Sequence, residues 1–148
     1  MEYFLNTYKE CRAAFRGSAK AALKSFPHSV RATIDIPRKG GEIDTLLVRG
    51  KRKPASRLIL IASGVHGVEG FVGSAIQRRI LDDLAATSLP SGCDVLFIHG
   101  INPYGFRHRR RVNERNVDLN RNFYFKREKV PKKEKNRGFR GLKSFFIP

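Results

Sequence analysis

The chain has 148 residues, of which 41% are apolar, and its formal net charge is +17. This length suits one domain with one hydrophobic core. No apolar run approaches the length of a membrane-spanning helix, and charged side chains interrupt residues 1–26, which excludes the apolar core of a signal peptide. Cys11 and Cys93 belong to no ligand-spaced cluster, so we interpret both as reduced. We expect a globular, cytoplasmic protein without a membrane partner.

The first third of the chain predicts a helix and two strands. Apolar residues three, four or seven apart across residues 1–26 form an amphipathic stripe, which ends before Pro27. Apolar and polar residues alternate over 30–36, as in a half-buried strand, and a Gly-containing turn leads to a second strand over 43–49. We expect these two strands to form a hairpin.

The chain is organised around residues 58–84. Residues 58–62 are an unbroken apolar run, the pattern of a strand buried on both faces at the centre of a parallel sheet. Apolar residues from 72 to 84 recur at helical spacing, and Gln77 and four charged residues fill the other face of that helix. A second apolar strand, also buried and parallel, is expected over 94–98. This order predicts an α/β fold with a mixed, largely parallel sheet and flanking helices.

Two side chains that can bind a metal ion lie in the turn after the 58–62 strand. His66 and Glu69 stand three residues apart, and in open α/β sheets the functional crevice lies at the carboxyl ends of the strands. Zinc binds imidazole nitrogen and carboxylate oxygen. A structural role is the alternative, because a loop histidine can bond backbone and a glutamate at a helix start favours the helix dipole.

Positive charge is concentrated between residues 107 and 143. This segment contains fifteen Lys or Arg and four acidic residues, so its net charge is +11. Such a segment fits nonspecific binding to nucleic acid, because Lys and Arg displace condensed counterions from phosphates. No base-reading motif accompanies it, and a solvated surface is the alternative. Hydrophobic periodicity is lost after residue 126, and we interpret 126–148 as a basic tail.

Three motifs occur in a fixed order along the chain. After His-x-x-Glu come Asn-Pro-Tyr-Gly at 102–105 and Val-Asp-Leu-Asn-Arg-Asn-Phe at 117–123. Together they resemble the zinc metallocarboxypeptidases of the carboxypeptidase A type, also called funnelins, and within them a little-characterised bacterial branch. The resemblance covers roughly residues 28–125, within a single partial domain of 1–148.

The resemblance implies a zinc site with a supporting carboxylate. His66 and Glu69 would be two of its three protein ligands. Asp118 would orient the histidine and fix its tautomer.

It also implies three residues that act on the substrate. Arg111 would polarise the scissile carbonyl, although Arg109 and Arg110 beside it are alternatives. Asn120 and Arg121 would hold the free carboxylate of the substrate, because an amide beside a guanidinium makes a planar fork. For each arginine a solvated surface charge is the other interpretation.

The chain departs from the family in its last part. Family members carry a third zinc ligand, a histidine from a later strand, and then a glutamate that acts as general base on the attacking water. The remaining histidines, His28, His99 and His108, do not occupy the expected position. We therefore interpret the chain as the front part of such an enzyme, truncated and catalytically inactive, or as a stand-alone remnant with another role.

Three functions remain open from the sequence. The first is a zinc-dependent carboxypeptidase-like hydrolase that cleaves an amide bond next to a free carboxylate in a peptide. The second is an N-acyl amino-acid deacylase that resembles succinylglutamate desuccinylase and aspartoacylase, which the Asn120-Arg121 pair does not distinguish from the first. The third is a non-catalytic basic protein that binds nucleic acid through its tail.

Overall fold

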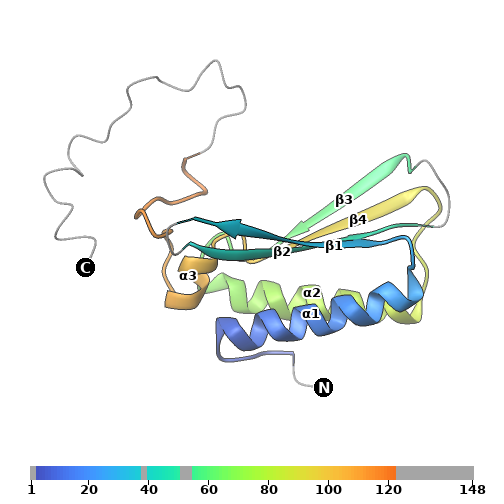
Figure 1. The fold of residues 1–148 in the computed structure, drawn as a ribbon, viewed down its shortest axis with the longest axis horizontal. Coiled ribbons are helices and arrows are strands. Elements are labelled where there is room, and N and C mark those ends of the chain that lie inside the picture. The colour runs from blue at the N-terminus through green and yellow to red at the C-terminus, as the bar shows by residue number, and fades with distance from the viewer. Residues whose placement is uncertain (1–2, 38–39, 51–54, 123–148) are drawn as a thin grey trace, which may run out of the picture.

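The computed structural model describes residues 3–37, 40–50 and 55–122. The elements are α1 (Tyr8–Ser25), β1 (Val30–Ile36), β2 (Gly41–Val48), β3 (Arg57–Ala62), α2 (Glu69–Ala86), β4 (Cys93–His99) and α3 (Pro103–His108). They form an α/β fold whose four-stranded mixed sheet has the order β1-β2-β4-β3. Helices α1 and α2 lie side by side under one face of this sheet, and the short α3 lies at one end of it (Figure 1). No helix in the described part of the chain is long and apolar enough to cross a membrane.

The strand pairing follows from the lengths of the connections. Residues 37–40 separate β1 from β2, which pair as the predicted antiparallel hairpin. Helix α2 provides the crossover that parallel strands need, and β3 pairs with β4 in parallel, as predicted. Because β2 pairs with β4 antiparallel, only one of the three strand pairs is parallel. The sheet is therefore mixed, with less parallel pairing than the sequence predicted.

Helix α1 begins later than its apolar stripe. Thr7 caps it, with the Glu10 backbone N–H donating to Thr7 Oγ1 at 3.2 Å and the Thr7 N–H donating to Glu10 Oε2 at 3.0 Å. This reciprocal pair satisfies two of the N–H groups at the helix start and so fixes the boundary. The predicted end is confirmed, since the helix stops at Ser25, two residues before Pro27.

The main core lies between the sheet and the two long helices. Phe15 of α1, Leu81 of α2, Leu46 of β2 and Phe97 of β4 are all fully buried. Every second side chain of β4 is buried because β4 lies inside the sheet between β2 and β3. The prediction of an apolar strand at 94–98 is confirmed, and both cysteines are buried and free.

The prediction that residues 58–62 are buried on both faces is wrong. In β3 the exposed fractions of Leu58, Ile59 and Leu60 are 58%, 49% and 57%. The apolar run correctly identified a strand, but burial depends on what covers it, and β3 is an edge strand with helices on one face only. For the same reason β1, at the other edge, is exposed over all but its last residue instead of half-buried.

The predicted faces of the second helix are correct only in part, since Ala75 is buried and Ile80 and Leu84 pack against the core as expected. Val72 and Ile76, expected on the buried face, are 48% and 52% exposed, whereas Gln77 is 1% exposed. Burial of this amide is possible because Gln77 Nε2 donates to the carbonyls of Ile61 and Ile98 at 2.9 and 3.0 Å. The helix is thus positioned by polar contacts with the ends of β3 and β4.

A buried ionic cluster joins α1 to the sheet. Asp44 of β2 is 1% exposed and accepts hydrogen bonds from Arg12 Nε at 2.7 Å, Arg16 Nη2 at 2.8 Å and Thr33 Oγ1 at 2.8 Å. Burial raises the pKa of Asp44, but the hydrogen bonds from Arg16, Arg12 and Thr33 outweigh it, and the net pKa lies below its usual value. The carboxylate is therefore ionised in the folded protein.

His99, the last residue of β4, is neutral in the folded protein. Its ring stacks on Phe15 with a centroid distance of 4.6 Å, and Nε2 lies 2.9 Å from Ser74 Oγ. Among the described residues, its buried Nδ1 has no hydrogen-bond partner. Burial lowers the pKa of His99 from 6.5 to about 4, while the nearby Asp44 partly opposes this shift and Arg12 adds to it.

We expect the stability of the protein to fall as the pH drops from 6.5 towards 4. In this range the unfolded chain protonates His99 and the folded chain does not, so the stabilisation is complete above pH 6.5 and decreases below it. The loss between pH 7 and 4.5 is on the order of 2 kcal/mol. Urea unfolding of His99→Gln should lack this part of the pH dependence, whereas the exposed His108→Gln should keep it. Equal pH dependence in His99→Gln and the parent chain would contradict this assignment.

Candidate metal site

The site lies where β3 and β4 end. Both strands continue into a glycine with a left-handed conformation, Gly64 with φ 71° and Gly100 with φ 71°. A Cβ atom on Gly64 would lie 3.0 Å from the Gly100 Cα, so the two chain segments pass each other too closely for a side chain. The β3 exit carries the loop with His66, and the β4 exit carries the Asn-Pro-Tyr-Gly motif.

Asn102 braces the loop that carries His66. Its backbone N–H donates to the Gly64 carbonyl at 2.8 Å and its Nδ2 donates to the Val65 carbonyl at 3.2 Å. Its Oδ1 accepts from the Gly105 N–H at 2.8 Å and so caps α3. The asparagine of this motif is 1% exposed, and its role is to join two loops.

Gly67 lets the His66 loop lie against the segment after α3. Its N–H donates to the Arg110 carbonyl at 2.9 Å. A Cβ atom at Gly67 would lie 1.8 Å from the Gly105 carbonyl oxygen, well inside contact distance. Because that neighbour is backbone, only glycine fits here without a shift of the loop.

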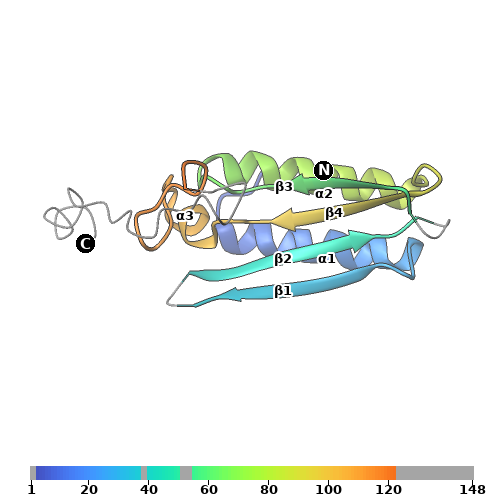
Figure 2. The ribbon, with the colours of Figure 1, turned by 90° about the horizontal axis from the view of Figure 1, so that it is seen from above.

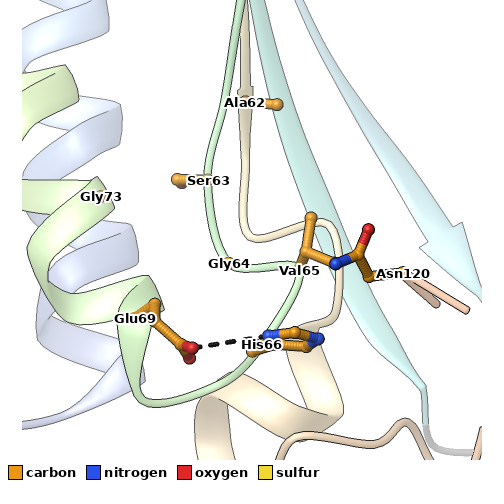
Figure 3. A pocket seen from close by; sticks show the side chains of 8 residues that line it. All are labelled: Ala62, Ser63, Gly64, Val65, His66, Glu69, Gly73 and Asn120. Atoms are coloured by element: carbon orange, nitrogen blue, oxygen red, sulfur yellow. Dashed lines mark ion pairs between the residues drawn. The ribbon is translucent and has the colours of Figure 1, made fainter. Parts of the chain in front are cut away.

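His66 lies between two carboxylates that come from distant parts of the chain. Glu69 is the first residue of α2, and its Oε1 lies 3.4 Å from His66 Nδ1 (Figure 3). On the other side of the ring, His66 Nε2 lies 3.0 Å from Asp118 Oδ1. The second oxygen of Asp118 accepts from Arg111 Nε at 2.7 Å. Four of the six site residues suggested by the sequence thus form one group that is connected through side chains.

Asp118 fixes the position of the proton on His66. The hydrogen bond from Arg111, followed by those from His66 and the Asn120 backbone, lowers the pKa of Asp118 to about 2. At neutral pH the Asp118 carboxylate is therefore ionised and can only accept hydrogen bonds. A neutral His66 then carries its proton on Nε2 and turns the lone pair of Nδ1 towards Glu69.

A pocket of about 320 Å³ opens beside these groups. It is lined by Ala62 at the end of β3 and the loop residues 63–66 after it, by Glu69 and Gly73 of α2, and by Asn120, whose side chain lies beside His66 and Val65 (Figure 3). Arg121 is exposed, its Nη1 donates to the Asn120 carbonyl at 3.1 Å, and it is not among the lining residues. Of the two residues predicted to form a carboxylate clamp, Asn120 is at the pocket and Arg121 lies outside it.

A family model described as "Protein of unknown function (DUF2817)" matches residues 4–148. The chain belongs to the DUF2817 family. No curated protein matches it.

In this DUF2817 chain the other histidines lie away from His66. His28 is in the turn between α1 and β1, and Figure 2 shows that these two elements join at the end of the sheet opposite α3. His99 is buried against Ser74. The ring of His108 contacts that of Tyr104, with centroids 4.5 Å apart. Across the described residues, no group of three or more His, Cys, Asp and Glu side chains is arranged to hold a metal ion.

The sequence interpretation missed a polar layer beneath the pocket. Ser63 Oγ donates to Gln77 Oε1 at 3.0 Å, and the Gln77 amide contacts the carbonyls at the ends of both β3 and β4. The sequence contained one indication of it, because Gln77 lies four positions before Leu81 and therefore on the same face of α2 as this buried residue. This layer holds the two strand ends, from which both site loops leave, at a fixed separation.

The basic segment of the DUF2817 chain is described only up to Asn122, so the predicted tail at 126–148 lies outside the described residues. Within the described part, Arg109 donates to the Asn6 carbonyl at 3.0 Å, and Arg111 and Arg115 pair with Asp118 and Glu114. These arginines therefore have partners within the protein, and the nucleic-acid interpretation stays a prediction.

Proposed function

We propose that this chain carries the first two ligands of a zinc-dependent hydrolase site, His66 and Glu69. The observation that carries the proposal is the contact between His66 Nδ1 and Glu69 Oε1 at 3.4 Å. This separation exceeds the usual 2.9–3.0 Å of an N–H···O hydrogen bond. With the His66 proton on Nε2, two electron-pair donors face each other, an arrangement that a shared cation stabilises.

The donor set and its spacing fit zinc. Ligand atoms about 2.1 Å from a tetrahedral zinc ion lie roughly 3.4 Å apart, which agrees with the 3.4 Å between the two donor atoms. When bound, zinc supplies a Lewis acid that polarises a carbonyl and acidifies water. Asp118 contributes by holding the imidazole in the ligating tautomer, as carboxylates commonly do behind zinc histidines.

The surrounding groups favour a substrate with a free carboxylate. Arg111 is 58% exposed and contacts Asp118 through Nε, at the side of its guanidinium group. Asn120 lines the pocket and presents an amide next to His66. We propose hydrolysis of an amide bond beside a carboxylate, with Arg111 stabilising negative charge on the carbonyl oxygen and Asn120 binding the carboxylate. Arg121, which lies outside the pocket, joins Asn120 in this role only if its side chain turns away from the Asn120 carbonyl. The same groups would serve an N-acyl amino-acid deacylase.

A third ligand and a general base are not found among the described residues around His66. We therefore propose that they come from residues outside the described part or from another polypeptide. Two protein ligands alone do not fix the geometry that activates water, and proton transfer also needs a positioned base.

The test compares the chain alone with a completed form. The purified chain is incubated with zinc and either dipeptides that have a free C-terminal carboxylate or N-acetyl amino acids. Mass spectrometry should detect no more hydrolysis than in buffer without the protein. Fusion at Pro148 to a segment that supplies a zinc-binding histidine and a general-base glutamate should give turnover. His66→Ala, Glu69→Ala and Arg111→Ala should each remove it.

The substrate panel separates the two hydrolase classes, and Arg121→Ala in the fusion should act mainly on KM. Robust, chelator-sensitive turnover by the unfused chain would show that the third ligand and base are already present, and would overturn the incomplete-site proposal. A fusion that folds and binds zinc but hydrolyses neither substrate class would reject the hydrolase assignment.

A further inference from the structure

Residues 113–117 form a closed turn between two side chains of the candidate site. Arg111 lies before this turn and Asp118 follows it directly, and Arg111 Nε donates to Asp118 Oδ2 at 2.7 Å. A flexible segment of six residues between them would allow many separations of the two side chains. The conformation of the turn therefore determines whether they meet.

Asn113 makes the hydrogen bonds that close the turn. Its Oδ1 accepts from the backbone N–H groups of Arg115 and Val117, both at 3.0 Å. Its own N–H donates to the Val117 carbonyl at 3.0 Å, and its carbonyl accepts from the Asn116 N–H at 2.9 Å. The first and last residues of the turn are thus joined through Asn113, and its side chain is the acceptor for two backbone N–H groups.

Asn116 gives the turn one specific shape. Its φ is 58°, in the left-handed region that residues other than glycine rarely adopt, although asparagine tolerates it better than most. Such a conformation persists only where the surrounding contacts fix it. Here the four hydrogen bonds of Asn113 do so, and the reversal at Asn116 brings the Val117 N–H back to the Asn113 side chain.

The turn orients Asp118 towards two partners at once. Asp118 Oδ1 lies 3.0 Å from His66 Nε2, and Oδ2 accepts from Arg111 Nε. Because each oxygen has a different partner, both contacts require one orientation of the carboxylate. A change in the path of residues 113–117 would weaken both contacts together, although Asn113 itself does not line the pocket.

We propose that Asn113 is a positioning residue of this site, which folds residues 113–117 so that the carboxylate of Asp118 holds both His66 and Arg111. This role rests on the proposed function, because it concerns a zinc ligand and the arginine that stabilises negative charge. Asn113 acts through the backbone of the turn and then through Asp118. Its loss should therefore weaken zinc binding although both zinc ligands are still present.

Zinc competition assays on variants of the full chain test this role. Asn113→Ala removes the acceptor of two N–H groups and should lower zinc affinity by about tenfold, the lower end of the loss expected when the support of a metal-bound histidine is removed. Asn113→Asp keeps an acceptor oxygen at the same place and should retain the parent affinity. Circular dichroism establishes that each variant folds.

Asn116→Ala disturbs the same turn in a second way, because alanine tolerates φ 58° less well than asparagine, and it should lower zinc affinity as Asn113→Ala does. It tests the turn even if Asn113→Ala does not fold. The matched control is Asn6→Ala. Asn6 is exposed, and its hydrogen bonds with Glu10 and Arg109 come from its backbone, so zinc affinity should not change.

A second measurement does not depend on zinc. In ¹H–¹⁵N NMR spectra of the zinc-free chain, the Arg111 Nε–H signal should lie downfield and exchange slowly with water, because this group donates to a carboxylate. Arg111→Lys identifies the signal by its loss. In Asn113→Ala the signal should move to the position of a free arginine, whereas Asn113→Asp and Asn6→Ala should keep it in place.

The two measurements separate the role of Asn113 from the proposed metal site. A parent chain that binds no zinc would reject the metal site, and the Arg111 signal would still decide whether Asn113 holds Arg111 against Asp118. An Arg111 signal and a zinc affinity that are unchanged in Asn113→Ala would overturn the positioning role. Equal losses in Asn113→Ala and Asn113→Asp would also overturn it, because the acceptor oxygen would then not be what matters.

Discussion

Zinc titrated into the 148-residue chain should bind at one weak site that disappears in His66→Ala. Two protein ligands leave the remaining coordination positions to water, so we expect an affinity far below that of a three-ligand site. Glu69→Ala should also remove binding, because its Oε1 is the second donor at 3.4 Å from His66 Nδ1. Competition against a chromogenic zinc chelator at fixed pH measures these affinities.

Asp118→Asn tests the supporting carboxylate separately. The amide carries no charge to hold the His66 proton on Nε2, and we expect zinc affinity to fall by about 10- to 100-fold. His108→Ala is the matched control, since His108 is exposed and contacts Tyr104. Stoichiometric zinc that survives dialysis against a chelator, or unchanged affinity in Glu69→Ala, would disprove the two-ligand site.

Gly67→Ala should destabilise the protein by about 1–3 kcal/mol, the usual cost of forcing an extra methyl group into a packed site. The new Cβ atom would lie 1.8 Å from the Gly105 carbonyl oxygen, so the backbone of the His66 loop or of α3 must move. Because the same loop carries His66, zinc affinity should fall with stability. Urea unfolding and the zinc competition assay measure the two effects on one preparation.

Gly17→Ala is the control for this glycine substitution. Gly17 is exposed in the middle of α1, and nothing lies within 4 Å of a Cβ atom built there. Alanine should therefore stabilise the helix by roughly 0.5–1 kcal/mol. If Gly67→Ala were as stable as the parent chain, the close approach of the two loops would not constrain the site.

Local patterns predicted the elements well and their surroundings poorly. Alternation and apolar runs identified the strands, and the short turn before Gly41 explains the hairpin. The exposure of Leu58 could not be predicted. An apolar run shows that a strand could be buried, but it does not show whether other strands or helices cover that strand. Gln77 can be buried because it bonds two carbonyls at the ends of different strands. Helical periodicity describes residues within one helix and cannot predict such contacts.

For the site, motif spacing placed His66 near Glu69 and the resemblance suggested Asp118 beside them, and the structure has all three in contact. The sequence did not indicate that Arg111 binds the same carboxylate as His66, since this depends on the path of the loop between residues 111 and 118. Nor did adjacency in sequence make Asn120 and Arg121 point to one place.

The strand order also constrains when the molecule can form during synthesis. β4 lies between β2 and β3, although it is the last of the four strands to leave the ribosome. Until it emerges, β3 has no neighbour to pair with, and the antiparallel contact that joins Asp44 to His99 must close a long loop. The nascent chain therefore carries the hairpin, an unpaired apolar strand and two exposed helices together. Such non-local pairing folds slowly, which makes the interval before β4 arrives the period of greatest exposure to aggregation.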